Sequence, residues 1–207
     1  MFTLACLVLL SVGFIGVPAG SQQPALAVPD QRAIPMLVGI TSSQQRWSGT
    51  GVIVGNGIVL TARHVIAGKM QLYLPNAVVE GHLACQEKDA DIAVVTSDLL
   101  SSAPSYRLSA SSPSIGDVVR IGGYPQGRWK VAESRVIGVA PSGKVGGATY
   151  NSPILWLRPD SALGPGASGS PLLNGQGQVV GILAGGTGGE DAAFPISTGL
   201  RACRGFL

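Results

Sequence analysis

The stretch Gly164-Pro165-Gly166-Ala167-Ser168-Gly169-Ser170-Pro171-Leu172 surrounds one serine with small residues. Small residues on both sides allow the backbone to fold tightly around Ser168. We expect the amides of Gly166 and Ser168 to point into one space and form an oxyanion hole, in which each donor contributes about 3 kcal/mol of transition-state stabilisation. The alternative is a glycine-rich hairpin turn, which this motif alone does not exclude. The chemical interpretation therefore depends on partners for the serine elsewhere in the chain.

The chain contains two histidines, and histidine is the usual general base near neutral pH. His64 lies in Leu60-Thr61-Ala62-Arg63-His64-Val65, directly after a strand-like run. His82 lies in Glu80-Gly81-His82-Leu83, where no partner motif surrounds it. A lone histidine is more often structural or solvated than catalytic. The serine motif is what favours His64 as a general base.

The order of these residues along the chain discriminates between the folds of serine hydrolases. An α/β-hydrolase needs a histidine after its serine, and none follows Ser168. A subtilisin-like order needs an acid before the histidine, but Asp30 is the only acid before His64 and lies outside any plausible core. The remaining order is histidine, acid, serine, which is the chymotrypsin order.

Asp91 is the best candidate for the acid of this series. It precedes the apolar run Ile92-Ala93-Val94-Val95, where a carboxylate at the edge of a barrel core orients one imidazole nitrogen and stabilises the imidazolium. Asp89 comes slightly earlier and is expected to be solvated. A charge before a strand is ordinarily a solubilising cap, but in this order we expect Asp91 to complete a catalytic triad with His64 and Ser168.

Composition and turn signals predict an all-β protein of short strands. Aromatic residues make up 5% and charged residues 12% of the chain, which has 30 glycines and 14 prolines. Gly55-Asn56-Gly57 predicts a hairpin between two apolar runs. A Ser/Pro-rich stretch, roughly residues 101–113, separates two groups of strand-like runs and suggests two small barrels. Such runs occupy residues 36–40, 51–54, 58–61, 71–74, 92–95, 118–122, 134–139, 154–157 and 179–183.

The N-terminal segment predicts export. Residues 2–17 are apolar and uncharged, and Ala25-Leu26-Ala27 resembles a signal-peptide cleavage site before Val28. Because no Lys or Arg precedes the apolar run, an uncleaved membrane anchor stays open, although the run is shorter than the roughly 20 residues that span a bilayer. The expected domains are residues 1–27 as leader, 34–106 as first barrel, 107–115 as linker, and 116–207 as second barrel with a short terminal helix within 197–204.

Charge and cysteine content limit the partners. A net charge of +3 without basic runs argues against nucleic acid as a partner. We find no metal-ligand spacing or phosphate-cradling loop, so we expect neither a metal nor another cofactor.

If Cys6 leaves with the leader, Cys85 and Cys203 remain. An even pair in an exported protein suggests a disulfide, and two separate buried thiols are the alternative.

Four stretches together resemble the motifs of trypsin-like serine peptidases, in particular the bacterial branch that includes the high-temperature-requirement proteases. The resemblance covers about Leu37 to Ile196 and implies two six-stranded antiparallel β-barrels with a catalytic cleft between them. It implies an endopeptidase acting on polypeptides, which the predicted leader would direct to the outside of the cell or to the cell envelope. The stretches are Ser48-Gly49-Thr50-Gly51-Val52-Ile53-Val54, Val59-Leu60-Thr61-Ala62-Arg63-His64-Val65, Asp89-Ala90-Asp91-Ile92-Ala93-Val94-Val95 and Gly166-Ala167-Ser168-Gly169-Ser170-Pro171-Leu172.

Two alanines depart from the relatives. Ala167 stands where animal digestive enzymes carry an Asp that pairs with a new amino terminus, so that activation switch is absent. Ala184 stands where many relatives carry a Ser or Thr whose hydroxyl bonds the catalytic carboxylate. This departure keeps two alternatives open: a catalytically idle binding module on the same fold, and a protease with one dedicated target.

The same resemblance places a substrate pocket at Ala162, Ala184, Gly185 and Gly186. Trypsin has Asp at the position of Ala162, so the sequence does not predict cleavage after Lys or Arg. The two glycines leave the pocket wall open. We expect a small or apolar residue before the scissile bond.

Overall fold

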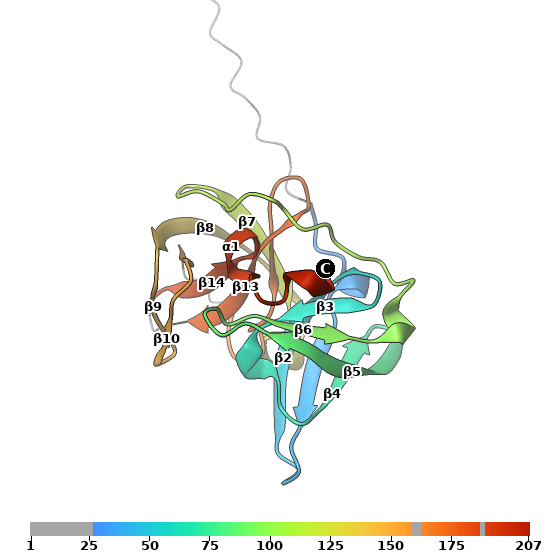
Figure 1. Ribbon diagram of the computed structural model, residues 1–207. Coiled ribbons are helices and arrows are strands. Elements are labelled where there is room, and N and C mark those ends of the chain that lie inside the picture. The colour runs from blue at the N-terminus through green and yellow to red at the C-terminus, as the bar shows by residue number, and fades with distance from the viewer. Residues whose placement is uncertain (1–26, 159–162, 187–188) are drawn as a thin grey trace, which may run out of the picture.

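A computed structural model describes residues 27–158, 163–186 and 189–207. Within these ranges the strands form two closed six-stranded antiparallel barrels, followed by a short C-terminal helix (Figure 1). The predicted fold class is thereby confirmed. The predicted leader, residues 1–27, lies outside the described residues except for Ala27. No helix in the described ranges is long and apolar enough to cross a membrane.

The first barrel has the strand order β1-β2-β3-β6-β5-β4. The predicted hairpin joins β2 to β3, and its central residues Asn56 and Gly57 have φ values of 48° and 73°. A type I′ turn requires positive φ at both positions, which explains the Asn-Gly pair. The strands are β1 (Met36–Ile40), β2 (Arg46–Gly55), β3 (Ile58–Thr61), β4 (Lys69–Leu74), β5 (Ala77–Gln86) and β6 (Ala93–Thr96).

The second barrel has the strand order β11-β14-β13-β12-β7-β8. A separate hairpin of β9 (Gly143–Val145) and β10 (Ala148–Tyr150) projects beside it. The barrel strands are β7 (Val118–Gly123), β8 (Lys130–Ala140), β11 (Ile154–Leu157), β12 (Pro171–Leu173), β13 (Val179–Gly186) and β14 (Asp191–Pro195).

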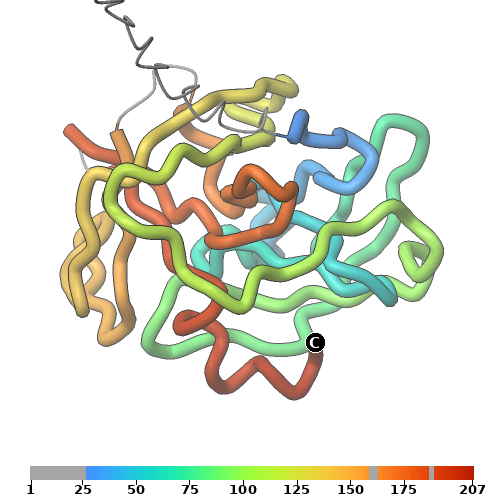
Figure 2. Tube along the Cα trace, turned by 90° about the horizontal axis from the view of Figure 1, so that it is seen from above, coloured from blue at the N-terminus to red at the C-terminus, as the bar shows by residue number. Residues whose placement is uncertain are grey.

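An apolar cluster joins the two barrels. Val52, Leu60 and Val94 of the first barrel belong to the same buried cluster as Ile182 and Phe194 of the second. The connection between β6 and β7 crosses the outside of the molecule (Figure 2) and is hydrogen-bonded to both barrels. Burial of apolar surface is the main force that holds such elements together. The strand ends that face this interface are therefore fixed relative to one another.

The C-terminal segment crosses back to the first barrel. Helix α1 (Ile196–Gly199) is a single turn, shorter than the predicted helix within 197–204. The helix ends before Leu200, whose backbone is not helical, and beyond it the buried carboxylate of Glu87 accepts the N–H groups of Ala202 and Cys203 at 3.2 and 2.9 Å. A disulfide joins Cys203 to Cys85 of β5. Further 3₁₀ turns span Gln31–Ala33, Arg63–Val65, Asp98–Leu100, Pro125–Gly127 and Arg204–Phe206.

Candidate active site

His64 and Asp91 lie together in the first barrel. His64 occupies the turn Arg63–Val65 just after β3, and Asp91 precedes β6, the neighbour of β3. One carboxylate oxygen of Asp91 lies 2.5 Å from His64 Nδ1, and the other accepts the backbone N–H of His64 at 3.0 Å. The Asp91 side chain is 2% exposed and that of His64 48% exposed. The carboxylate therefore fixes the ring while leaving its far side open to solvent.

The alternative residues lie outside this pair. Asp89 is exposed, as the sequence predicted. His82 is exposed on β5, where its carbonyl accepts a hydrogen bond from the hydroxyl of Thr96. Neither of them contacts the His64–Asp91 pair through a hydrogen bond among the described residues.

Thr50 of β2 holds the loop that carries Ser168. The backbone N–H of Thr50 donates to the carbonyl of Ser168 at 2.8 Å, and its hydroxyl donates to the carbonyl of Gly166 at 2.9 Å. The same hydroxyl accepts the N–H of Tyr124 at 3.0 Å. Thr50 is fully buried. A residue of the first barrel thus fixes the backbone of the serine loop in the second, a role that the sequence did not reveal.

Two glycines allow this loop to approach the first barrel closely. A Cβ atom on Gly169, whose φ is 88°, would lie 1.9 Å from the carbonyl oxygen of Thr50. A Cβ atom on Gly49 would lie 2.5 Å from the Val65 side chain and 3.0 Å from the Ser168 carbonyl. These contacts bring the backbone of Ser168 next to the turn that carries His64.

The hydroxyl of Ser168 donates to the carbonyl of Ala184 at 3.1 Å. Within the described residues it forms no hydrogen bond with His64. Hydrogen bonds between catalytic groups are often long or misaligned before a substrate binds. A rotation about χ1 of Ser168 is enough to change the partner of this hydroxyl, because its backbone is held independently by Thr50.

The peptide bond between Pro165 and Gly166 has a defined orientation. The N–H of Gln126 donates to the carbonyl of Pro165 at 2.7 Å. Since this peptide bond is trans, the N–H of Gly166 points away from Gln126. Gly166 has a φ of 96°, and a Cβ there would lie 2.6 Å from the carbonyl oxygen of Tyr124. Only glycine fits this backbone.

A cavity of about 350 Å³ lies directly beside Ser168. Gly185 and Gly186 are among the residues that line it. Ala184 is not among its lining residues: its side chain is buried, and its carbonyl accepts the Ser168 hydroxyl. Ala162 lies outside the described residues. The full lining consists of Leu163, Gly164, Pro165, Ala167, Ser168, Leu183, Gly185, Gly186 and Asp191.

Asp191 is a pocket residue that sequence reasoning missed. It begins β14, directly before the apolar run Ala192-Ala193-Phe194. The signal that singled out Asp91, an acid placed just before a buried strand, is therefore present at Asp191 as well. No motif around Asp191 pointed to the serine, because β14 is placed beside the site by its pairing with β13.

Tyr150 and Arg63 lie near the acid of the pair. The guanidinium carbon of Arg63 lies 5.7 Å from the centre of the Tyr150 ring. Burial raises the pKa of the Tyr150 hydroxyl, and the nearby negative charge of Asp91 raises it further, while Arg63 lowers it. Tyr150 therefore stays a neutral phenol near neutral pH and adds no second negative charge beside Asp91.

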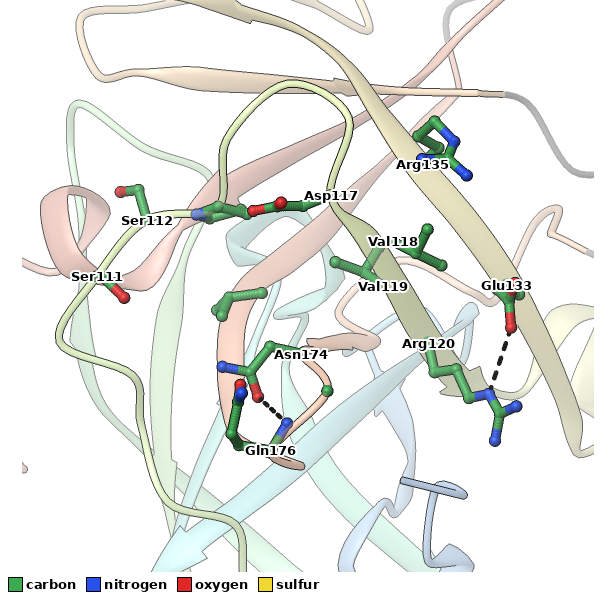
Figure 3. A pocket seen from close by; sticks show the side chains of 13 residues that line it. Ser111, Ser112, Asp117, Val118, Val119, Arg120, Glu133, Arg135, Asn174 and Gln176 are labelled. Carbon is green, nitrogen blue, oxygen red and sulfur yellow. Dashed lines mark hydrogen bonds and ion pairs between the residues drawn. The ribbon is translucent and has the colours of Figure 1, made fainter. Parts of the chain in front are cut away.

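A second cavity, of about 600 Å³, lies on the outer side of the second barrel (Figure 3). Its lining includes Arg120 and Glu133, whose charged groups lie 3.6 Å apart, but none of His64, Asp91 and Ser168. In the described ranges no group of three His, Cys, Asp or Glu side chains is arranged to hold a metal ion. The chemically reactive side chains thus gather at the barrel interface and not in this larger hollow.

Two closed six-stranded barrels, with a His–Asp pair from one and a serine on a tight loop from the other, define the chymotrypsin-like class. The chain belongs to the family of the trypsin-like peptidase domain, whose sequence model matches residues 49–182. Among its relatives is a protein of Hahella chejuensis named as a DegP-like periplasmic serine endoprotease, 30% identical over 74% of this chain and 34% of the relative. The zebrafish serine protease HTRA1A is 29% identical over 65% of this chain and 29% of the relative. The chain spans about a third of the length of these relatives.

Solved structures share the fold. The Rv3671c protease of Mycobacterium tuberculosis in its active form superimposes with a TM-score of 0.72 at 19% identity, covering 91% of both chains. A serine endoprotease of Yersinia pestis has a TM-score of 0.64 at 25% identity, covering 80% of this chain and 59% of that one. At 19% identity, the Rv3671c protease is similar to this chain in fold alone.

Proposed function

We propose that the protein is a serine endopeptidase in which Ser168 is the nucleophile, His64 the general base and Asp91 the residue that orients His64. The Ser168 oxygen attacks the scissile carbonyl carbon as its proton passes to Nε2 of His64. The oxyanion accepts hydrogen bonds from the N–H groups of Gly166 and Ser168. His64 then gives the proton to the leaving amine, and water releases the acyl group from Ser168 by the same steps.

The observation that carries this proposal is the double hydrogen bond between Asp91 and His64, at 2.5 and 3.0 Å. It holds the ring with Nδ1 toward the carboxylate, which leaves Nε2 available as the base. The contacts of Thr50 and Gly49 with the Ser168 backbone support the placement of the nucleophile beside this ring. The orientation of the Pro165–Gly166 peptide supports an N–H donor at Gly166.

Labelling with a fluorophosphonate tests this proposal, because such probes react with an activated serine. We expect the wild-type protein to be labelled and Ser168→Ala to remain unlabelled. Ser170→Ala is the matched control, since Ser170 is a buried serine of the same loop, and it should still be labelled. Labelling that persists in Ser168→Ala would contradict the choice of nucleophile. An unlabelled, folded wild-type protein would favour a catalytically idle binding module.

We also propose that residues 1–27 export the chain to the periplasm or the cell envelope. Relatives named as periplasmic support this location, as does the disulfide between Cys85 and Cys203, since disulfides persist in oxidising compartments. Cell fractionation followed by mass determination of the mature N-terminus tests the proposal. A protein recovered from the cytoplasm with Met1 and with Cys85 and Cys203 as free thiols would refute it.

A further inference from the structure

Arg63, the residue before His64, joins the two segments that carry the His64–Asp91 pair. Its backbone N–H donates to the carbonyl of Asp91 at 3.3 Å. Its Nη1 donates to the carbonyl of Glu87 at 3.0 Å and lies 3.4 Å from the carbonyl oxygen of Lys88. The turn after β3 and the segment before β6 are thus connected through one side chain. A displacement of Arg63 would therefore change the position of His64 relative to Asp91.

Tyr150 of β10 brings the second barrel to this guanidinium. Cζ of Arg63 lies over the ring of Tyr150, 5.7 Å from its centre, where a guanidinium is attracted to the face of an aromatic ring. The ring itself is held in place, because it is buried and meets the fully buried ring of Phe194 edge-on, with 4.8 Å between the ring centres. The guanidinium of Arg63 is therefore held between carbonyl groups of the first barrel and an aromatic ring of the second.

The Asp91 carboxylate depends on this support because it has few partners of its own. Among the described residues, its side-chain hydrogen bonds go to His64 alone. Ala184 carries no hydroxyl that could add a further bond. The relative position of the two groups is therefore set by the two backbone segments that Arg63 connects.

We propose that Tyr150 is a positioning residue for the His64–Asp91 pair and acts by holding the guanidinium of Arg63. The inference rests on the proposed function of the pair. Both residues act on the backbone that carries the pair, and neither takes part in proton transfer. Loss of the ring frees the guanidinium to move and loosens the turn that carries His64. A displacement of about 1 Å in a catalytic group is enough to lower a rate by about 100-fold.

Variants of the two residues test this proposal, with kcat and KM measured for one peptide substrate and corrected for the folded fraction from circular dichroism. Tyr150→Leu removes the ring and should lower kcat by about tenfold or more, with KM changed by less than about twofold. Tyr150→Phe keeps the ring face and should restore kcat to within about threefold of the wild-type value. Arg63→Gln should lower kcat as Tyr150→Leu does. Because Arg63 is only partly buried, this variant provides the measurement if Tyr150→Leu fails to fold.

Lys88→Gln is the matched control. It removes a positive charge from the same segment but keeps the carbonyl that faces Arg63, so kcat should be unchanged. The double variant Arg63→Gln/Tyr150→Leu should be no slower than the slower single variant, because the two residues act through one contact. Losses that multiply, an unchanged kcat in Arg63→Gln, or an equal loss in Lys88→Gln would each overturn the proposal.

Proton NMR of Ser168→Ala provides a measurement that needs no turnover. The Nδ1 proton of His64 exchanges slowly with water while it is bonded to Asp91, and its loss in Ser168→Ala/Asp91→Asn assigns the signal. Adding Arg63→Gln to Ser168→Ala should speed this exchange by about tenfold. Adding Tyr150→Phe should not change it.

Unchanged exchange after Arg63→Gln would overturn the positioning role. Faster exchange after Arg63→Gln, together with a wild-type protein that hydrolyses no peptide, would instead refute the proposed function and leave the positioning role standing.

Discussion

The first barrel presents His64 and Asp91 already hydrogen-bonded to each other, whereas the second barrel presents Ser168 with its hydroxyl bonded to the carbonyl of Ala184. The His–Asp contact lies within one barrel and involves a buried acid. A contact between His64 and Ser168 must cross the interface between the barrels. The difference teaches that each barrel can order its own groups, while alignment between barrels depends on the backbone contacts of Thr50.

The largest expected loss of kcat comes from removing His64 from the first barrel or Ser168 from the second. His64→Ala and Ser168→Ala should each lower kcat by about a million-fold, because base and nucleophile act as one unit. The double variant should be no slower than either single variant. Measuring kcat with one peptide substrate for all three variants checks this. If the loss of kcat in the double variant equalled the product of the two single losses, His64 and Ser168 would act independently.

Removing the carboxylate of Asp91 in the first barrel should lower kcat less than removing His64 or Ser168. Asp91→Asn keeps the shape of the side chain but no longer holds His64 in the correct tautomer, so kcat should fall by about 10⁴-fold. Asp89→Asn is the matched control, because Asp89 is an exposed acid two positions earlier in the chain, and its kcat should be unchanged. If the two variants behaved alike, the assignment of Asp91 would be wrong.

Removing the disulfide tests how strongly it holds the C-terminal segment on the first barrel. Cys85 and Cys203 are 118 positions apart, and a cross-link over such a loop typically contributes about 2–5 kcal/mol to stability. The variant Cys85→Ser/Cys203→Ser should lower the free energy of unfolding by that amount in urea titrations. An unchanged midpoint in urea would show that the buried Glu87 carboxylate alone anchors the C-terminal segment.

The hydroxyl of Thr50 tests the alignment across the interface directly. Thr50→Val preserves the shape but leaves the carbonyl of Gly166 and the N–H of Tyr124 without this partner, at a cost of about 2 kcal/mol in stability. Thr50→Ser retains the hydroxyl and serves as the control. We expect kcat to fall in Thr50→Val and to be nearly normal in Thr50→Ser, measured alongside thermal unfolding. Equal kcat values in the two variants would show that the hydroxyl does not position the serine loop.

The smallest effect concerns Tyr106, on the connection between the barrels. Its hydroxyl accepts the N–H of Asp30 at 2.5 Å, so Tyr106→Phe should cost about 1 kcal/mol. Burial raises the pKa of Tyr106 above its ordinary value of 10.0. The folded state therefore holds this proton more tightly, and its contribution to stability is present below pH 10 and lost as pH rises through the raised pKa.

Unfolding free energies measured from pH 8 to 11.5 should fall above about pH 10 in the wild-type protein, where unfolded tyrosines begin to ionise. The fall should be shallower in Tyr106→Phe, which has lost one of the three tyrosines with a raised pKa; Tyr124 and Tyr150 remain. An identical slope in both proteins would show that Tyr106 has the same pKa in the folded and unfolded states.

Sequence reasoning succeeded where the signal was local. The Asn56-Gly57 pair predicted a hairpin because the turn geometry demands these residue types. Strands β5, β9, β10, β12 and β14 were missed. Strand β5 is largely exposed, and β9, β10 and β12 have only three residues each. Strand β14 contains two alanines and a proline, which are depleted in strands. The fold was still predicted, since the spacing of the remaining strands was enough to indicate two barrels.

The candidate site could also be predicted only in part from the sequence. The order of His64, Asp91 and Ser168 along the chain was informative, because few folds use it. Thr50 and Asp191 carried no such order. Thr50 acts through a contact between β2 and the serine loop, which are far apart in sequence. Asp191 lines the cavity beside Ser168 because β14 pairs with β13, and this pairing is a matter of three-dimensional structure. Local patterns do not contain that information.

The contacts of Thr50 have a consequence for exchanging parts between related proteins. A chimaera that took residues 116–207 from a relative would bring a new serine loop onto the old β2. Because Thr50 bonds two carbonyl groups and one N–H group of that incoming half, the graft would inherit its nucleophile from one parent and the support of its loop from the other. The natural unit of exchange is therefore the second barrel together with Arg46–Gly55, although these two parts are separated in the chain by most of the first barrel.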